Sequence, residues 1–494
     1  MSAAGRLEGS GRSAAALPAA HEGHVPHVPQ ADSTSGDPLA PDAGARTIAL
    51  AVRERAVSAS EVVARTLARI ALLNPAINAL TDVAERRARE QAQAIDVLLD
   101  RGQDPGPLAG VPFVVKANID VRDLVTTAGS RLHAQDAPAR RDAAVVAALT
   151  QAGAVCMGAA NMDEFGLGGT TENACFGPTR NPHDLARTAG GSSGGPAAAV
   201  AAGMVPFSIG SDGLGSVRLP ASLCGVYGLR PTRDRFSNVG VLGAGGSLST
   251  PGPFARSAHD LALVIDAVVG NDDAQSALAQ TSGAPTLRIG VADGYFEQNL
   301  DDDAGAAVMA IARTLRATRR VRYPEAALAR AAATLVFAAE GGHAYLDLLR
   351  TRGDEFDPRT RDRFLAHALL PAAWYLRAQA FRAWHREQVL ALLGDVDVIL
   401  FPATPCVAPP LGTPTIRING LEQPTGPSLG VFAQPLAPTG CPVLTVPVAR
   451  REGLPLGVQL LARPHAEADL VRIAAWLESE GAVAACVGRA ATAA

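Results

Sequence analysis

Short apolar runs alternate with amphipathic stretches along most of the chain, and this alternation predicts strands that take turns with helices. The apolar runs predict buried strands at residues 111–115, 154–158, 205–210, 287–292, 397–402 and 442–447. Apolar residues with helical spacing predict helices at residues 142–151, 195–203, 303–316, 372–393 and 466–480. This order favours an α/β fold with a mixed, mostly parallel central sheet that is covered by helices on both faces.

The helix expected from residue 59 onward has the clearest start signal in the chain. Ser58 and Glu61 have the spacing of a capping box, and apolar residues follow at helical intervals. Asn74 and Pro75 then predict the end of this helix, because proline cannot continue the pattern of backbone hydrogen bonds.

The chain divides into a tail and one large domain. Residues 1–43 are rich in alanine, glycine, serine and proline and lack the large apolar side chains that order a segment, so we expect a disordered, low-complexity tail. His21, His24 and His27 lie in this tail at intervals of three, and solvated histidines are a better interpretation than a metal site. Residues 44–494 contain neither a repeat nor a linker and predict a single domain.

Composition and charge exclude several classes of partner and location. The formal net charge is −4 and 48% of the 494 residues are hydrophobic, so we expect neither nucleic acid nor a membrane as partner. No apolar run is long enough to cross a bilayer, and residues 14–20 are too rich in alanine for a signal peptide. The six cysteines form no C-x-x-C pair, which predicts reduced thiols in the cytoplasm.

Residues 191–195 match the G-x-S-x-G pattern of an α/β-hydrolase, with Ser193 as the nucleophile. That assignment requires a later acid and a histidine, and no histidine stands in an obvious catalytic turn. Lys116 offers another base, because it directly follows a strongly apolar run. A buried ammonium is costly unless it is paired or loses its proton, and the neutral amine is a base. The alternative is an ordinary surface lysine at a strand end.

Several motifs occur in one order: Lys116, then "GGSSGG" at residues 190–195, then "GSDGLGSVRLP" at residues 210–220. Together with "NMDEFGLGGTTEN", "DVILFPATP" and "GLPLGVQLL", they resemble the amidase signature family over nearly the whole chain after residue 44. The resemblance implies that Ser216 is the nucleophile and that Ser192 relays its proton to Lys116. It also implies a cis peptide bond between Gly191 and Ser192, and it makes the elbow pattern at Ser193 a false match.

The same resemblance implies a set of groups around the nucleophile. These are the oxyanion-hole amides of Gly213, Leu214, Gly215 and Ser216 and the supporting side chains of Ser193, Asp212 and Arg218. A phosphate-binding loop is the alternative for this glycine-rich turn, but the turn lacks the Gly-Lys-Ser/Thr ending that such a loop has. Leu214 stands where the family usually has a second glycine, and Pro196 where it has a small residue, so the substrate range is in question.

Two further stretches, at residues 171–195 and 371–389, are most similar to family members that act on small, planar, nitrogen-rich acids. Arg382 matches a position that binds the substrate carboxylate in a relative, the catalytic subunit of the glutamine-dependent tRNA amidotransferase. A guanidinium fits a carboxylate, although a solvated arginine on a long helix explains Arg382 equally well. The resemblance also places Met162 on the pocket floor, together with the three residues that follow it.

The expected activity is hydrolysis of a small linear amide through an acyl-enzyme, with neither a metal nor an organic cofactor. The resemblance implies a small helical partner subunit or a homodimer. The alternatives are a broad-range amidase, a catalytically silent scaffold and the catalytic subunit of the amidotransferase. Residues 426–435 contain no acid to bind the α-ammonium of glutamine, which disfavours the amidotransferase.

Overall fold

The computed structural model describes residues 36–488 apart from residues 244, 280–285, 419, 451 and 486. Most of the tail expected over residues 1–43 lies outside these described residues, and so do His21, His24 and His27. Residues 37–43 were expected to belong to the disordered tail, but they are described and are hydrogen-bonded to the domain, which corrects this part of the expectation. Within the described residues, no helix combines the length and the apolar character that a membrane crossing requires.

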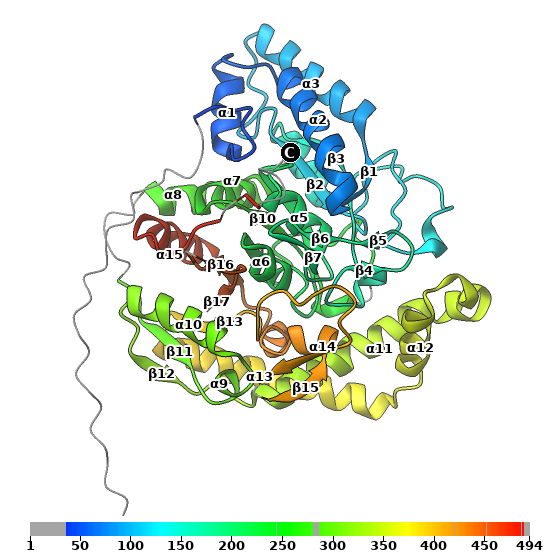
Figure 1. Ribbon diagram of the computed structural model, residues 1–494, viewed down its shortest axis with the longest axis vertical. Helices are drawn as coiled ribbons and strands as arrows, with labels where there is room; N and C mark the ends of the chain where they lie inside the picture. Colours follow the sequence, from blue (N-terminus) through cyan, green and yellow to red (C-terminus); the bar gives the residue numbers. More distant parts are fainter. Residues whose placement is uncertain are drawn as a thin grey trace, which may run out of the picture.

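An 11-stranded sheet forms the centre of the molecule, in the order β1-β3-β2-β8-β10-β9-β16-β17-β13-β11-β12 (Figure 1). The strands, in chain order, are β1 Leu80–Val83, β2 Pro112–Lys116, β3 Val155–Ala160, β8 Phe207–Asp212, β9 Tyr227–Arg230, β10 Thr250–Ala255, β11 Ile289–Ala292, β12 Arg319–Val321, β13 Val398–Pro402, β16 Val443–Pro447 and β17 Gly457–Ala462. Each strand expected from an apolar run overlaps one of these. The α/β class and the single domain are confirmed.

The expectation of a mostly parallel sheet is corrected by the central strands. β2 is parallel to β3 and β8, and β11 is parallel to β12 and β13. Between β8 and β13 in the strand order, the described pairs are antiparallel. The connections explain this, because the loop from β16 to β17 is too short for the crossover that parallel neighbours need. β10 in addition lies between β8 and β9 and runs opposite to both.

Helices cover both faces of the sheet. α5 (Gly194–Ala201) and α6 (Arg218–Cys224) pack on β8, β9 and β16, while α7 (Ala258–Val269) and α15 (Glu467–Ser479) pack on β10, β16 and β17. The core is formed by fully buried strands and by the alanine-rich α5, whose small side chains allow the helix to approach the sheet closely.

The helix α2 (Ala59–Ile77) begins as expected and ends later than expected. Ser58 Oγ accepts a hydrogen bond of 3.0 Å from the Glu61 amide. Pro75, however, lies inside the last turn, and the helix ends at Asn78, which has a left-handed backbone conformation. The Asn74 side chain hydrogen-bonds both the N–H and the C=O of Leu80. These bonds fix the segment that follows the helix.

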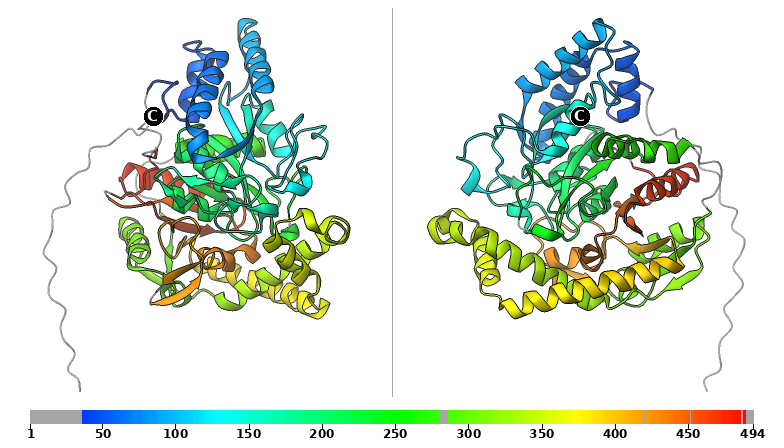
Figure 2. Two further views of the ribbon diagram at one scale, coloured as in Figure 1. Left: turned by 45° about the vertical axis from the view of Figure 1, so that its right-hand side comes forward. Right: turned by 180° about the vertical axis from the view of Figure 1, so that it is seen from behind.

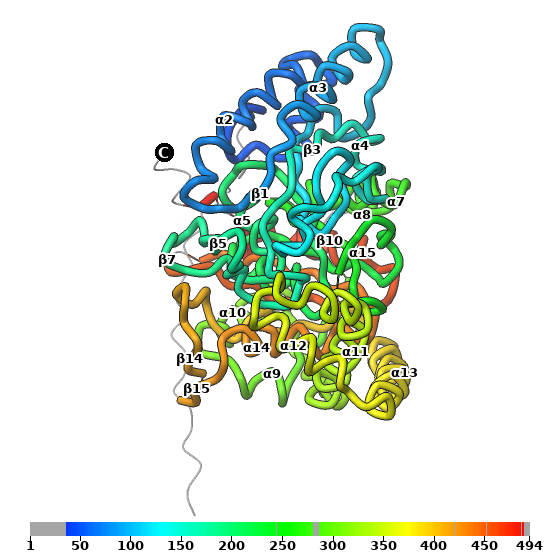
Figure 3. Tube along the Cα trace, turned by 90° about the vertical axis from the view of Figure 1, so that its right-hand side faces the viewer, coloured from blue at the N-terminus to red at the C-terminus, as the bar shows by residue number. Residues whose placement is uncertain are grey.

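Three helices form an arm beside the sheet, which we call the helical arm. They are α11 (Ala326–Arg352), α12 (Pro358–Ala368) and α13 (Ala372–Asp395), and α11 packs against both of the others (Figure 2). Figures 1 and 3 both show the arm in the lower part of the molecule, where the short helix α14 (Thr425–Leu429) also lies. The arm thereby brings α12 next to the loops that follow the central strands.

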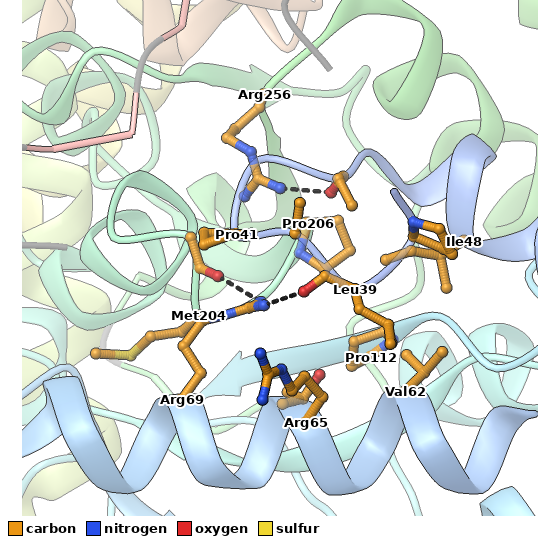
Figure 4. A pocket seen from close by; sticks show the side chains of 15 residues that line it. Leu39, Pro41, Ile48, Val62, Arg65, Arg69, Pro112, Met204, Pro206 and Arg256 are labelled. Carbon is orange, nitrogen blue, oxygen red and sulfur yellow. Dashed lines mark hydrogen bonds between the residues drawn. The ribbon is translucent and has the colours of Figure 1, made fainter. Parts of the chain in front are cut away.

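Residues 37–43, which we call the N-terminal strap, are fastened to the domain by two arginines (Figure 4). Arg69 donates to the carbonyls of Leu39 and Gly203, at 2.6 and 3.0 Å. The buried Arg256 donates to three carbonyls, and these belong to Ala43, Val200 and Val205. The space left between these groups is about 10 Å³, so the arginines bind backbone rather than a ligand.

Replacing Arg256 with methionine should destabilise the protein by about 2 kcal/mol or more, because buried carbonyls would lose their donor. Urea unfolding would measure this as a lower midpoint. Arg65→Met is the matched control, since Arg65 is exposed in the same region. Equal midpoints for the two variants would contradict this role of Arg256.

Candidate active site

A lysine and several serines meet where β2 and β8 end. The two strands are parallel neighbours, so Lys116 at the end of β2 lies beside Ser211 and Asp212 at the end of β8. Lys116 Nζ is 2.8 Å from Ser192 Oγ and 3.1 Å from Ser211 Oγ. The structure thus joins Lys116 directly to one of the two serines that the sequence predicted for its proton relay.

Burial decides the charge state of Lys116. Its side chain has no exposed surface, and desolvation lowers its pKa to about 7, although the carboxylates of Asp163 and Asp212 act in the opposite direction. A substantial fraction of the amine is therefore neutral near neutral pH. In that form, the 2.8 Å contact lets Nζ accept a proton from Ser192 Oγ.

The glycine-serine loop before α5 connects Lys116 to the turn that contains Ser216. The Gly191–Ser192 peptide bond is cis. Ser193 Oγ donates to the Ser211 carbonyl at 3.1 Å, and the Ser193 amide donates to the Ser216 carbonyl at 3.2 Å. Ser193 therefore connects the loop to the turn through its hydroxyl and its amide. These bonds explain the serine at this position without a role as nucleophile.

Asp212 lies at the centre of a buried ionic network. Its carboxylate accepts from Arg218 at 3.0 and 3.1 Å and from Arg230 at 3.0 Å, and all three side chains are essentially inaccessible. Burial alone would raise the pKa of Asp212, but the two guanidinium groups outweigh this effect and hold the pKa well below its usual range. The sequence had indicated Arg218 but not Arg230.

The turn after β8 follows from this network, and it corrects one expectation. The Gly215 amide donates to Asp212 Oδ1 at 2.8 Å and the Val217 amide to Oδ2 at 3.2 Å. Gly215 therefore cannot offer its N–H to an oxyanion, because Asp212 already occupies it. Gly215 has a φ of +123°, and a Cβ there would lie 2.5 Å from Leu219 Cδ1, so only glycine fits.

Three other amides of the turn are available. In the part of the chain that the structure describes, the N–H groups of Gly213, Leu214 and Ser216 donate to no protein acceptor. Such groups can stabilise a developing oxyanion.

A cavity of about 250 Å³ opens beside this turn, and Ser216 is partly exposed in it. Six segments form its walls: the loop after β3, the loop before α5, the turn after β8, the helices α11 and α12 of the helical arm, and the segment around α14. The lining residues are Gly166, Leu167, Gly168, Gly169, Gly191, Leu214, Gly215, Ser216, Leu219, Thr334, Phe337, Ala338, Arg363, His367, Gly426, Pro427, Gly430 and Gln434.

Two residues expected to bind substrate lie elsewhere. Arg382 is not part of the cavity lining, because its guanidinium donates to Ser247 Oγ at 2.7 Å and to the Ser247 carbonyl at 2.8 Å. It fastens α13 to the loop before β10. Met162 is fully buried behind the site, where it packs with Ala117 and Ala159.

The residues after Met162 divide between different surroundings. Glu164 accepts from Ser130 Oγ at 2.6 Å and faces a second cavity, while Phe165 packs among the aromatic side chains beneath α12. Asp163 lies against the glycine-serine loop, since its amide donates to the Ser192 carbonyl at 3.2 Å and its Oδ2 would be 2.2 Å from a Cβ on Gly191. Burial raises the pKa of Asp163 to about 6 against the opposing influence of its backbone donors and Lys116.

The cationic group in the cavity wall is Arg363. Its guanidinium donates to the Leu167 carbonyl at 2.8 Å, and His367 lines the same wall one helical turn later. The sequence prediction missed both residues because α12 has only a short buried stripe, Thr360 and Phe364, and was not expected as a helix. Their spacing of four was the one available signal.

The fold and this grouping place the chain among amide-cleaving hydrolases. A model of the Amidase family matches residues 61–471, and the chain belongs to this family. Among curated relatives, the AtzE subunit of 1-carboxybiuret hydrolase from Pseudomonas sp. (strain ADP) is 46% identical over 436 residues, which are 86% of this chain and 95% of that protein. The A subunit of glutamyl-tRNA(Gln) amidotransferase from Chloroflexus aurantiacus (strain ATCC 29366 / DSM 635 / J-10-fl) is 36% identical over 84% of this chain and 92% of its own length.

Solved structures agree with this assignment. One, reported as an unexpected vestigial protein complex that reveals the evolutionary origins of an s-triazine catabolic enzyme, has a TM-score of 0.87 and 44% identity, and covers 90% of this chain and 99% of its own. Another, 6-aminohexanoate cyclic dimer hydrolase complexed with substrate, has a TM-score of 0.79 and 26% identity, and covers 90% and 97%.

Amide hydrolysis should increase with pH through an apparent pKa of about 7, because Lys116 has to be neutral to accept a proton. The measurement is kcat/KM from about pH 5 to about pH 9. Activity that is flat across this range or falls toward alkaline pH would contradict Lys116 as the base.

Asp163→Asn should move this acid limb to lower pH. The Asp163 carboxylate raises the pKa of Lys116, and Asn removes that charge, so Lys116 would lose its proton at a lower pH. Glu172, Arg359 and Arg363 also face Asp163 electrostatically and stay in place in this variant. An acid limb at the wild-type position, with activity present, would contradict the coupling.

Proposed function

We propose that the protein hydrolyses a small, carboxylated, nitrogen-rich amide of the 1-carboxybiuret type, with Ser216 as nucleophile. The observation that carries this proposal is the buried contact of 2.8 Å between Lys116 Nζ and Ser192 Oγ, beside a turn whose Ser216 opens into the cavity. A serine hydroxyl needs a neighbouring base to become a nucleophile, and a neutral lysine supplies one here.

The reaction runs through an acyl-enzyme. Ser216 Oγ attacks the amide carbonyl carbon while its proton passes to Ser192 and the Ser192 proton passes to Lys116. The tetrahedral intermediate breaks its C–N bond, and the leaving nitrogen takes the proton back along the same route. Water then attacks the ester, is deprotonated by the same relay, and releases the acid and free Ser216.

The oxyanion in this mechanism rests on the amides of Gly213, Leu214 and Ser216. Asp212 contributes indirectly, because it holds the Gly215 and Val217 amides and so fixes the direction of the turn. Losing one oxyanion donor typically costs about 10²–10³ in rate.

The cavity walls favour an anionic substrate. Arg363 supplies a guanidinium, and no carboxylate side chain occurs among the described residues that line the cavity. Gln434 stands where an acid would bind the ammonium of glutamine, and its Oε1 accepts from Arg330 at 2.7 Å. We therefore infer that glutamine is not the substrate and that Arg363, rather than Arg382, contacts the carboxylate.

Two alternatives remain open to experiment. A broad-range amidase would ignore Arg363 and accept neutral amides. A catalytically silent scaffold would bind without reacting, and it would leave Ser216 unlabelled by a serine-directed fluorophosphonate.

We further propose that the protein assembles in the cytoplasm with a small helical partner or as a homodimer. The helical arm supports this, because it exposes five large apolar side chains on α12 and α13 and between them, and these are Leu365, Leu369, Trp374, Leu376 and Trp384. Exposed apolar clusters commonly mark interfaces. The five described cysteines are all free thiols, in keeping with a reducing compartment.

Ammonia release from carboxylated ureas, oxamate, neutral amides and glutamine tests the proposal. Ser216→Ala should abolish turnover, and Arg363→Ala should raise KM for the acidic substrates about tenfold to a hundredfold while leaving neutral amides unchanged. Arg361→Ala on the same helix is the matched control. If Arg382→Ala rather than Arg363→Ala removes the preference for acids, the assignment of Arg363 is wrong.

A further inference from the structure

The helix α12 has one face toward the core and another toward the cavity. Thr360 and Phe364 are buried toward the core, whereas Arg363 and His367 line the cavity. The backbone of α12 is fixed against α11, because a Cβ on Gly342 would lie 2.7 Å from the His367 carbonyl carbon and 2.6 Å from the following amide nitrogen. His367 is therefore held in the cavity wall by backbone packing as well as by its own side chain.

The His367 imidazole packs against an aromatic ring, and one of its nitrogens is buried without a hydrogen-bond partner in the described part of the chain. Its ring meets Phe364 edge-to-face, with centroids 6.0 Å apart. Its Nδ1 atom is buried and has no hydrogen-bond partner among the described residues. Nε2 is not buried and has no hydrogen-bond partner among the residues that the structure describes, so it is the ring nitrogen that a ligand in the cavity can reach.

Burial, followed by the nearby Arg363 guanidinium, lowers the pKa of His367 to about 4. The ring is then neutral at physiological pH, with one nitrogen as a donor and the other as an acceptor. Arg363, in contrast, has donors only. The pair thus offers a carboxylate site next to one neutral imidazole nitrogen, which can make a single hydrogen bond to a neighbouring ureido group.

We propose that His367 is a specificity-determining residue whose Nε2 hydrogen-bonds the ureido group of a substrate whose carboxylate Arg363 binds. This inference rests on the proposed function. His367 is not the base of the reaction, because no hydrogen bond among the described residues joins it to Lys116, Ser192 or Ser216.

The test measures binding through protection of Ser216, so it does not require turnover of the probe. Ser216 is labelled with a small fluorophosphonate in the presence of increasing concentrations of one of two probes. The first probe is oxalurate, which is a carboxylated urea. The second is oxamate, which keeps the carboxylate and one amide but lacks the ureido group. For His367→Ala, the half-protecting concentration of oxalurate should rise about tenfold, and that of oxamate should stay within about twofold. His367→Gln, which keeps a neutral donor and acceptor, should recover part of the oxalurate effect.

His343→Ala is the matched control, since His343 is exposed on α11. The unprotected labelling rate of His367→Ala should equal that of the wild type, which a variant with a collapsed cavity would not achieve. An equal change for oxalurate and oxamate, or no change for either, overturns the proposal. If wild-type Ser216 is not labelled at all, the proposed function fails, and this outcome is distinct from a failure at His367.

Discussion

The active site depends on one buried carboxylate, Asp212, held between two arginines. Burying this anion without a partner would cost a large desolvation free energy, and the two guanidinium groups offset that cost. Each arginine then uses its remaining donors on distant parts of the chain: Arg218 on the Ala433 carbonyl and Gln459, and Arg230 on the Leu248 carbonyl. The turn with Ser216 is therefore connected, through Arg218, to segments that lie 215 and 241 residues later in the sequence.

This network also explains how Lys116 loses its charge although two carboxylates lie nearby. Asp212 is already neutralised by Arg218 and Arg230, so it attracts the ammonium weakly. Asp163 is itself disfavoured as an anion by burial. Desolvation is left as the dominant influence on Lys116. The site gains a base without a histidine because desolvation of Lys116 outweighs the attraction of both carboxylates.

The sequence predicted well whatever depends on local pattern and poorly whatever depends on distant contacts. Apolar runs located strands, and a capping box located the start of α2, because both are determined within a few residues. Strand direction was wrong in the centre of the sheet, where β10 enters between β8 and β9 for reasons of tertiary packing. Pro75 was wrongly expected to end α2, which continues to Ile77; the contact of Asn74 with Leu80, which fixes the following segment, could not be read from the sequence. Arg363 lies in the cavity wall because of the way α12 packs against α11, and no sequence motif indicated this packing.

The docking of α12 has a consequence for how such an enzyme changes over evolutionary time. The chemical groups sit on strand ends and loops that are tied into the core, while the charge and hydrogen-bonding pattern of the cavity wall come from a surface helix of 11 residues. A few substitutions along that helix would change which substrates the cavity binds and would leave the folded core and the groups that cleave the bond unchanged. Substrate binding and bond cleavage therefore depend on residues in different parts of the fold, and these residues can change independently.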